Sequence, residues 1–563
     1  MNTDAMDETA ANHELRGESQ MAVIDRRSFL RTSALGLAGA AVSHWAATAA
    51  AQARSVDAHI EVLPNEPLGT ISPNIYGHFT EDLGGVIYDG IWVGENSKVA
   101  NVNGIRKSLV EHLRTIHAPV IRFPGGCFAD SYDWRDGIGP RDQRRRTNNF
   151  WGGSDSNHFG TNEFVEFCRL AGAEPYLAVN VRSLAAQQFV EWVEYCNSPA
   201  GNTTLADRRA AAGFEEPFNV KYWGIGNEAW GCGGNFEPAE YAMEYRRFAT
   251  WVPRYGQELM FIASGPRDDQ YDWTSALFEA LAKKDPSFDT PWGCALHFYA
   301  WNLSRGRTTD WDKGKGDAVN FEDVDWYEIL REGQKMEIFI ERHWEVMGQT
   351  DRQHKVKLVV DEWGPWYRPG SEVTPGFGLQ QMPTLRDAVF SGMTLDIFNR
   401  HPEKVAMANC AQLINCLNSL YLAHEDQFVV TPVGRVFEMY AAHQGGSAVR
   451  AVFNAPEVSY ERGGKTATFW GLQGSASLHD KRLAVTAVNP DVTQARETEI
   501  AVRGAKPKSA AMTVLTAKDI HAHNTFAEPD AVAVRVGEAK VTGASVAVGI
   551  PAASVVKVEM ELA

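Results

Sequence analysis

Apolar runs alternate with amphipathic helical patterns through the middle of the chain, from about residue 70 to residue 415. In the helical patterns apolar residues recur at every third or fourth position; in 104–117, for example, Ile105, Leu109 and Leu113 share one face. The intervening apolar runs predict eight strands, at 70–79, 118–125, 174–181, 220–228, 259–265, 292–301, 356–363 and 405–415. Eight strand-then-helix units predict an α/β fold of the (β/α)8 barrel (TIM barrel) class.

A doubly wound open sheet is the alternative arrangement of such units. It is disfavoured, because no glycine-rich phosphate loop follows the first predicted strand. Beyond about residue 430 the pattern changes to short alternating strands separated by Gly, Pro, Asn and Asp. We therefore expect the barrel over 70–430 and a C-terminal, jelly-roll-like β-sandwich over 431–563, with the segment 54–69 adding an N-terminal strand to the sandwich.

The N-terminal 53 residues have the pattern of an export signal. Arg26 and Arg27 precede a modest apolar stretch over 34–50, and Ala-Gln-Ala at 51–53 supplies a small-x-small cleavage site. This order predicts a twin-arginine signal peptide and a periplasmic or secreted protein. An amphipathic helix of the mature protein is the alternative. Met21 lies just ahead of the signal. Translation therefore starts either at Met1 or at Met21, and in the second case residues 1–20 are not part of the protein.

Charge and cysteine content narrow the classes of partner. The 563 residues carry a formal net charge of −17, which argues against nucleic acid or an anionic membrane as a partner. The seven cysteines show no spacing typical of metal ligands, and we predict neither a metal nor a cofactor. Five of them lie in apolar segments and are expected in the core, with one or two surface thiols elsewhere: Cys168, Cys196, Cys294, Cys410 and Cys416.

Polar side chains gather where the predicted barrel strands end. Functional groups of such barrels lie at the carboxyl ends of the strands. Glu228 and Glu362 each close an apolar run, where an unpaired buried carboxylate would cost several kcal/mol unless it faced a polar cleft. The full set of strand-end candidates, some of which serve only as structural caps, is Glu81, Arg122, Cys127, Asn180, Asn227, Glu228, His297, Tyr299, Glu362 and Gln412.

Two carboxyl groups facing one cleft are typical of glycoside hydrolysis. One group protonates the leaving oxygen, and the other stabilises or attacks the anomeric carbon. A separation of about 5–5.5 Å between them gives retention of configuration, whereas about 6.5–9.5 Å gives inversion. The sequence names Glu228 and Glu362 for these tasks but does not fix their separation.

Seven ordered motifs give the chain a specific resemblance to the α-L-arabinofuranosidases of glycoside hydrolase family 51. They cover the whole predicted barrel: NIYGHFTE at 74–81, YDGIW at 88–92, RFPGGCFAD at 122–130, YDWRDGIGP at 132–140, WGIGNE at 223–228, DEW at 361–363 and AQLIN at 411–415. The resemblance implies a (β/α)8 barrel with a β-sandwich and a retaining hydrolase. It also implies a carbohydrate substrate, such as arabinan, arabinoxylan or their oligosaccharides, and a homo-oligomer.

The resemblance also implies roles for individual residues. Glu228 matches the general acid/base and Glu362 the nucleophile, while Asn227 matches a residue that binds the sugar 2-hydroxyl. Both Asn227 and Glu228 reach the sugar only if the strand end is irregular, because successive residues of a strand face opposite ways. The other expected site residues either hold the nucleophile (Arg122, Tyr299), contact or orient the furanose (Glu81, Cys127, Gln412), form apolar walls (Trp151, Trp366) or support the site (His297, Asn180).

Several alternatives remain open at this point. Cys127 has a second interpretation as a buried thiol, and Trp151 as a structural residue. The substrate of a related retaining enzyme would be a β-xyloside or an internal β-glucan bond, and a non-catalytic carbohydrate-binding protein on the same scaffold is the alternative of another class. A metal-dependent barrel enzyme is disfavoured by the ligand spacings. The charged stretch 304–325 is either a lid over the site or a long loop.

Overall fold

The computed structural model describes residues 56–284, 290–301, 303, 311–374 and 376–563, and the side chains of 311 and 312 lie outside that description. The expected twin-arginine segment therefore falls outside the described residues, as does the part of the proposed lid over 304–310. No helix in the described ranges has both the length and the apolar character that crossing a bilayer requires.

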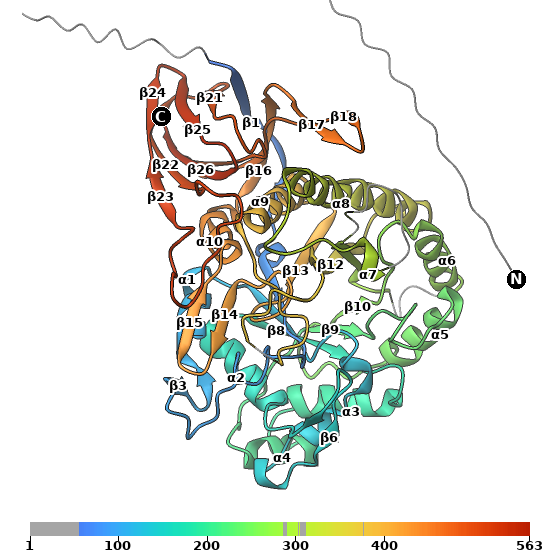
Figure 1. Cartoon of the computed structure of the whole chain (residues 1–563). Helices are drawn as coiled ribbons and strands as arrows, with labels where there is room; N and C mark the ends of the chain where they lie inside the picture. The colour runs from blue at the N-terminus through green and yellow to red at the C-terminus, as the bar shows by residue number, and fades with distance from the viewer. Residues whose placement is uncertain (1–55, 285–289, 302, 304–310, 375) are drawn as a thin grey trace, which may run out of the picture. The chain divides into compact units, whose positions relative to one another are not determined.

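Eight parallel strands close into a barrel (Figure 1), which confirms the predicted fold class. Closure is completed by parallel pairing of the last strand with the first, in which Asn409 lies opposite Gly77. In order around the barrel the strands are β2 (Gly77–Phe79), β5 (Val120–Phe123), β8 (Glu174–Val179), β9 (Tyr222–Ile225), β10 (Met260–Ala263), β11 (Gly293–Ala300), β12 (Lys357–Pro365) and β13 (Val405–Ala411).

Several helices that follow the barrel strands bury apolar residues in the main core. In the first of them, α1, Leu109, Val110 and Leu113 are buried. A helix with an apolar stripe at this spacing is stabilised mainly by packing that stripe against the strands. The helices are α1 (Lys107–Thr115), α2 (Thr161–Ala171), α3 (Ala186–Asn197), α4 (Thr204–Ala211), α5 (Pro238–Ala249), α6 (Tyr271–Ala282), α7 (Trp311–Gly314), α8 (Asp323–Thr350), α9 (Leu385–Arg400) and α10 (Pro432–Tyr440).

The first predicted barrel strand, 70–79, is wrong in its extent. Residues 73–76 form a short 3₁₀ helix, η1 (Pro73–Tyr76), and only the three residues of β2 join the barrel. Proline has no backbone N–H for a strand ladder, and its fixed φ suits the first position of a helical turn. The Ser72 hydroxyl caps this turn by accepting a hydrogen bond from Asn74 N at 3.3 Å.

A second, ten-stranded sheet contains the C-terminal strands and the N-terminal strand β1 (Ala58–Thr70). Figure 1 shows β1, in blue, among the red and orange strands; it pairs with β16 on one side and with β21 on the other. Apolar residues of the sheet, including Ile60, Val485 and Val558, form a core of their own. The other strands are β16 (Ser447–Asn454), β19 (Gln473–His479), β20 (Arg482–Asn489), β21 (Arg496–Val502), β22 (Pro507–Leu515), β23 (Val534–Gly537), β24 (Ala539–Thr542), β25 (Ser545–Ile550) and β26 (Ser554–Leu562).

A buried polar cluster connects helix α9 of the barrel to this sheet. The Asp396 carboxylate accepts hydrogen bonds from Ser475 Oγ at 2.6 Å, Thr486 Oγ1 at 2.5 Å and Tyr440 Oη at 2.8 Å. Burial raises the pKa of Asp396 to about 6, although these hydrogen bonds lower it in part. Buried carboxylates are tolerated only when they are hydrogen-bonded in this way, so the cluster fixes the sheet against α9.

Candidate active site

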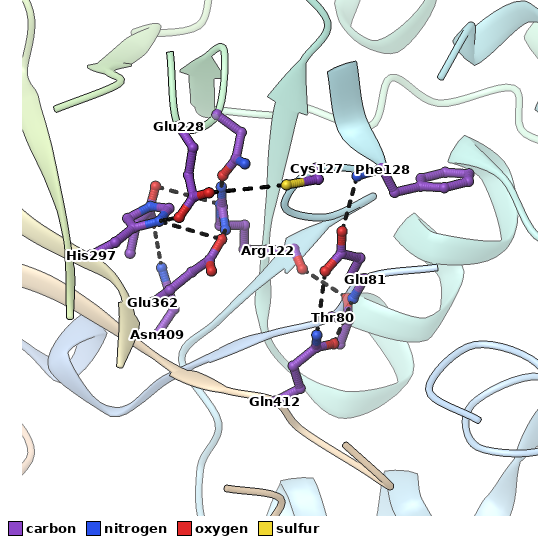
Figure 2. Close-up of polar contacts among 12 residues, drawn as sticks. Thr80, Glu81, Arg122, Cys127, Phe128, Glu228, His297, Glu362, Asn409 and Gln412 are labelled. Atoms are coloured by element: carbon purple, nitrogen blue, oxygen red, sulfur yellow. Dashed lines mark hydrogen bonds and ion pairs between the residues drawn. The ribbon is translucent and has the colours of Figure 1, made fainter. Parts of the chain in front are cut away.

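The carboxyl ends of the barrel strands surround a cavity of about 530 Å³. Ten of the twelve residues predicted for the site line it, and Arg122 lies directly behind one of them. The predicted lining residues are Glu81, Cys127, Trp151, Asn227, Glu228, His297, Tyr299, Glu362, Trp366 and Gln412. Figure 2 shows Glu228 and His297 at one side of this group, with Glu81 and Gln412 at the other.

A bulge in strand β12 directs the carboxylates of the neighbouring residues Asp361 and Glu362 to different surroundings. Ala295 of β11 lies opposite Val359, but His297 lies opposite Glu362, so β12 contains one more residue than β11 over this stretch. A bulge of this kind locally redirects side chains. As a result Glu362 lines the cavity, while the carboxylate of Asp361 is held within the barrel by Tyr176 Oη at 2.6 Å and Asn409 Nδ2 at 2.8 Å.

Glu362 is held by donors on both of its oxygens. Arg122 Nη1 donates to Oε1 at 2.8 Å, and Tyr299 Oη donates to Oε2 at 2.8 Å. Burial alone would raise the pKa of Glu362, but His297, Arg122 and the Tyr299 hydroxyl outweigh burial and lower it. Glu362 is therefore kept as a carboxylate in a nearly dry environment, since each of these neighbours favours its charged form.

Arg122 organises the floor of the site. Its side chain is only 1% exposed, and its Nε lies 3.4 Å from Asp361 Oδ2. A second guanidinium nitrogen, Nη2, donates to Asn227 Oδ1 at 2.6 Å. Burial would lower the pKa of Arg122, but the Asp361 and Glu362 carboxylates raise it above its usual value. The planar guanidinium thus fixes three neighbours at once, which a lysine ammonium cannot do with the same geometry.

Glu228 lies beyond the regular part of its strand. β9 ends at Ile225, Gly226 has φ +86°, and Glu228 has φ +42°, a value that is uncommon for any residue other than glycine. This irregular backbone allows Asn227 and Glu228 both to line the cavity, as the sequence required. The Glu228 side chain is 19% exposed, against 7% for Glu362.

His297 lies between the two glutamates. Its Nδ1 is 3.0 Å from Glu228 Oε1 and 3.6 Å from Glu362 Oε1. Burial would lower the pKa of His297, but the Glu362 and Glu228 carboxylates outweigh burial and raise it. Because both neighbours of Nδ1 are acceptors, Nδ1 carries a proton and donates it. One oxygen each of Glu228 and Glu362 and a ring nitrogen of His297 all lie within 4.8 Å of one another.

Glu81 closes the opposite side of the cavity. Its Oε1 accepts hydrogen bonds from Phe128 N and Trp151 Nε1, both at 2.9 Å, and its backbone N–H donates to Gln412 Oε1 at 3.0 Å. Burial, and then the charge of Glu362, raise the pKa of Glu81 to about 7. Gly126 is required here, because a Cβ at this position would lie 2.9 Å from Glu81 Oε2.

Two predicted residues differ from the expectation, one in its position and one in its chemical state. Asn180 does not line the cavity; its amide donates to Tyr132 O at 3.1 Å and Ser183 Oγ at 2.7 Å, so it connects two loops. Cys127 does line the cavity, but as half of a disulfide with Cys232 and not as a thiol. The five other cysteines are all buried, so the expectation of one or two surface thiols is wrong.

The prediction missed four polar or aromatic residues that line the Glu228 side. The Arg267 guanidinium lies 4.7 Å from the centre of the Trp230 ring, and burial raises the pKa of Asp268 to about 6. Trp301 directly follows β11. Trp230 could have been found from the sequence, since it is two residues after Glu228. Arg267 and Asp268 come four and five residues after β10, so a search confined to strand ends does not find them.

Two groups of side chains in the described ranges bring metal-ligand atoms close together. The group of Cys127, Cys232 and Glu228 offers no thiolate, because both sulfurs belong to the disulfide. In the group of Glu228, His297 and Glu362, His297 is hydrogen-bonded to Glu228, and Glu362 is hydrogen-bonded to Arg122 and Tyr299. A pair of carboxylates with these partners suits acid/base and nucleophilic chemistry directly.

Comparisons with known proteins agree with this geometry. The chain matches two family profiles, described as an α-L-arabinofuranosidase 1 domain over residues 112–315 and an α-L-arabinofuranosidase C-terminal domain over residues 361–554. It is 35% identical, over 89% of its own length and 93% of the relative's, to a Bacteroides ovatus protein named intracellular exo-α-L-arabinofuranosidase.

Solved structures give the same result. The GH51 arabinofuranosidase from Xanthomonas axonopodis pv. citri has a TM-score of 0.83 and 35% identity, over 90% of this chain and 100% of that one. The arabinose complex of the α-L-arabinofuranosidase from Thermotoga maritima has a TM-score of 0.77 and 30% identity, over the same shares of the two chains.

Proposed function

Since the chain belongs to the α-L-arabinofuranosidases of glycoside hydrolase family 51, we propose that it hydrolyses terminal, non-reducing α-L-arabinofuranosyl residues with retention of configuration. The proposed substrates are arabinose-containing plant polysaccharides or the oligosaccharides derived from them. The observation that carries the retaining mechanism is the approach of the Glu228 and Glu362 oxygens to within 4.8 Å. That distance fits the separation of about 5–5.5 Å in retaining enzymes, and an inverting water needs about 6.5–9.5 Å.

In the first chemical step, a Glu362 oxygen attacks the anomeric carbon while Glu228 protonates the leaving oxygen. The donors Arg122 and Tyr299 support this role of Glu362, because they hold it ionised before substrate arrives. The proton of Glu228 is assigned to Oε2, since Oε1 already accepts from His297 Nδ1 at 3.0 Å. The products of this step are a glycosyl ester on Glu362 and a free alcohol.

In the second step, water replaces Glu362 at the anomeric carbon. The Glu228 carboxylate, which lost its proton in the first step, now removes a proton from this water. Formation of the ester removes the negative charge of Glu362 beside His297, 3.6 Å away, so the imidazole then faces Glu228 as its one remaining carboxylate. The hydrolysis restores the Glu362 carboxylate and the protonated Glu228.

Exo-action is supported by the shape of the site. Glu81 and Gln412 are 3% and 1% exposed, and they close the cavity on the side away from Glu228. Among the described residues, Trp230 and Arg267 line the cavity on the Glu228 side, and we infer that the rest of a sugar chain extends past them. The name of the Bacteroides ovatus relative describes that protein as exo-acting. An endo-glucanase would need a groove open at both ends.

Stereochemistry is the direct test of the mechanism. We expect the wild-type enzyme, with methanol as acceptor, to give methyl α-L-arabinofuranoside as the first product seen by ¹H NMR, and the β-anomer would overturn retention.

We expect Glu228→Ala to keep most of its kcat/KM on a 2,4-dinitrophenyl arabinofuranoside, whose leaving group needs no proton, and to lose roughly 10²–10⁴-fold on an alkyl arabinofuranoside. Azide should restore kcat of this variant and give the α-azide.

The sugar preference has its own test. We expect release of p-nitrophenol from the α-L-arabinofuranoside far above release from the β-D-xyloside, and no cleavage of an internally labelled β-glucan. Preference for the xyloside or the glucan would keep the mechanism and replace the substrate. No turnover of any of the three would favour the non-catalytic carbohydrate-binding protein.

We also propose export by the twin-arginine route to the periplasm or the medium. The supporting observations are Arg26-Arg27 ahead of an apolar stretch and the Cys127–Cys232 disulfide, a bond that persists in oxidising compartments. The Bacteroides ovatus relative is named intracellular, so the location of this chain needs its own test. Cell fractionation decides it: replacing both arginines by lysine should retain the protein in the cytoplasm, and equal distribution of both forms would overturn export.

A further inference from the structure

The Cys127–Cys232 disulfide lies directly against Glu228. It joins the loop after β5 to the loop after β9, across 105 residues of sequence, with its Cα atoms 5.6 Å apart. The sulfur of Cys232 is 3.6 Å from Glu228 Oε2, and that of Cys127 is 4.0 Å from the same oxygen. Figure 2 shows Cys127 reaching toward this carboxylate. The bond is therefore part of the wall on which the Glu228 carboxyl rests.

The backbone that carries Glu228 lies outside the regular strand and is held by hydrogen bonds from the surrounding loops. The strand has already ended, and the loop that follows contains glycines at 226, 231, 233 and 234. Glycine gives a loop more conformational freedom than any other residue. Two hydrogen bonds, from Gly231 N at 2.7 Å and Gly233 N at 3.1 Å, tie Glu228 O into this loop, and Ala229 N donates to Ser264 Oγ at 3.0 Å. The disulfide is the covalent tie between this loop and the neighbouring strand end.

The two oxygens of Glu228 face different surroundings. Oε1 accepts from His297 Nδ1, whereas Oε2 faces the two sulfurs. A disulfide sulfur carries no proton, so neither contact is a hydrogen bond and neither satisfies a negative charge on Oε2. The sulfurs act by filling space: they limit the rotation of the carboxyl and keep Oε2 turned toward the cavity.

We propose that the Cys127–Cys232 disulfide positions the acid/base Glu228, so that breaking the bond impairs proton delivery to the leaving group more than it impairs nucleophilic attack. This inference rests on the role of Glu228 in the proposed function. Cys127 is then a positioning residue that acts through Glu228. The nucleophile side provides the contrast, because Glu362 is held by Arg122 and Tyr299, which belong to strands β5 and β11.

The test compares the oxidised enzyme with the folded enzyme reduced by a phosphine, on two substrates. We measure kcat/KM, which reports the first chemical step, for the 2,4-dinitrophenyl and an alkyl α-L-arabinofuranoside. We expect reduction to lower kcat/KM at least 10-fold for the alkyl glycoside and less than 2-fold for the dinitrophenyl glycoside. A thiol titration should show two new thiols per chain. Equal losses on both substrates, or none, would overturn the positioning role.

The double variant Cys127→Ser, Cys232→Ser supplies the matched control. It should show the same selective loss as the reduced wild type and should not respond to the phosphine, which excludes effects of the reductant elsewhere. Thermal unfolding of both forms shows whether stability is lost in general. Such a loss would lower activity on both substrates alike, unlike the selective loss expected here. If the double variant does not fold, the reduced wild type still gives the answer.

Measuring Glu228→Ala on the same two substrates tests the acid/base role of Glu228 separately from the positioning role of the disulfide. If this variant loses activity equally on both substrates, the acid/base assignment fails whatever the disulfide does. If the variant is selective and reduction is not, the acid/base assignment stands and only the positioning role of the disulfide fails.

Discussion

The two glutamates proposed to be catalytic lie within one cavity but are held in different ways. Glu362 is on a strand, is almost fully buried, and receives hydrogen bonds from Arg122 and Tyr299 on its two oxygens. Glu228 is on a glycine-rich loop, is more exposed, and has His297 as the hydrogen-bond partner of one oxygen, while the other faces a disulfide. The proposed nucleophile is therefore held by hydrogen-bond donors on both oxygens, and the proposed acid/base by one donor and by packing against the disulfide.

This difference matches what the proposed mechanism requires of each residue. A nucleophile must be ionised whenever substrate arrives, so permanent donors help it, and hydrogen bonds to a charged group contribute about 1.5–3 kcal/mol each. An acid/base must be protonated in one step and ionised in the next. A second strong donor on Glu228 would hold it in one of these states and slow the other step.

The largest expected effect is on Glu362, the proposed nucleophile. Glu362→Ala should lower kcat/KM by roughly 10⁵-fold or more on every substrate, including the dinitrophenyl glycoside, because no leaving group replaces a missing nucleophile. Azide should restore turnover with inverted, β-configured product. The control is Glu345→Ala, a glutamate that is 65% exposed on α8. Selective loss on poor leaving groups would exchange the roles of the two carboxylates.

A smaller effect tests the guanidinium that holds Glu362. Arg122→Lys should lower kcat/KM roughly 10²–10³-fold, the size expected for one lost preorganised donor, because an ammonium cannot serve Glu362, Asp361 and Asn227 together. Without the guanidinium hydrogen bond at 2.8 Å, the charged form of Glu362 loses stabilisation, so Glu362 should gain its proton at higher pH and the acid limb of the pH profile should move upward. Arg342→Lys, at an exposed ion pair, is the control. An unmoved acid limb would show that Arg122 does not govern the ionisation.

The barrel and both glutamates were predictable from the sequence, for a physical reason. Each barrel strand is buried on both faces, so it appears as a continuous apolar run, and the polar residue that ends it is conspicuous. Glu228 and Glu362 were found in this way. The extent of the first strand was not, because Ile71 and Ile75 continue the apolar pattern through a segment that Pro73 turns into a 3₁₀ helix.

The parts of the site that depend on contacts between distant loops were not predictable. Cys127 and Cys232 are 105 residues apart, and neither the spacing nor the surrounding pattern pairs them. Arg267 and Asp268 come several residues after β10, where the backbone is irregular and strand periodicity gives no direction. These contacts decide how Glu228 is held, so the sequence described the nucleophile side better than the acid/base side.

A still smaller effect tests the second donor on Glu362. Tyr299→Phe removes one hydrogen bond to the carboxylate at 2.8 Å, so kcat/KM should fall roughly 10–100-fold. Tyr367→Phe is a matched control, since the buried Tyr367 hydroxyl donates to Asp387 Oδ1 at 2.8 Å outside the cavity. The loss should be equal on the dinitrophenyl and alkyl glycosides. A loss confined to the alkyl glycoside would mean that Tyr299 acts on proton delivery from Glu228.

The smallest expected effect concerns Glu81, a buried carboxylate without a cation bonded to it. Its pKa is raised from 4.5 to about 7, so the unfolded chain loses this proton first and the cost to the folded state develops between pH 4.5 and 7. Glu81→Gln removes that cost. Relative to wild type, the variant should therefore be more stable at pH 8 than at pH 5, by up to about 3 kcal/mol from a shift of this size.

Thermal unfolding at the two pH values measures this difference, with Glu345→Gln as the exposed baseline. A gain at pH 8 would show that burial dominates where no guanidinium bonds the carboxylate, and that Arg122 is what separates Glu362 from this case. Equal differences at both pH values would mean that Glu81 is ionised throughout, held by the N–H groups of Phe128 and Trp151. Hydrogen bonds alone would then keep a buried carboxylate charged in this cavity, and the contrast between Glu362 and Glu228 would rest on the number of donors rather than on the cation.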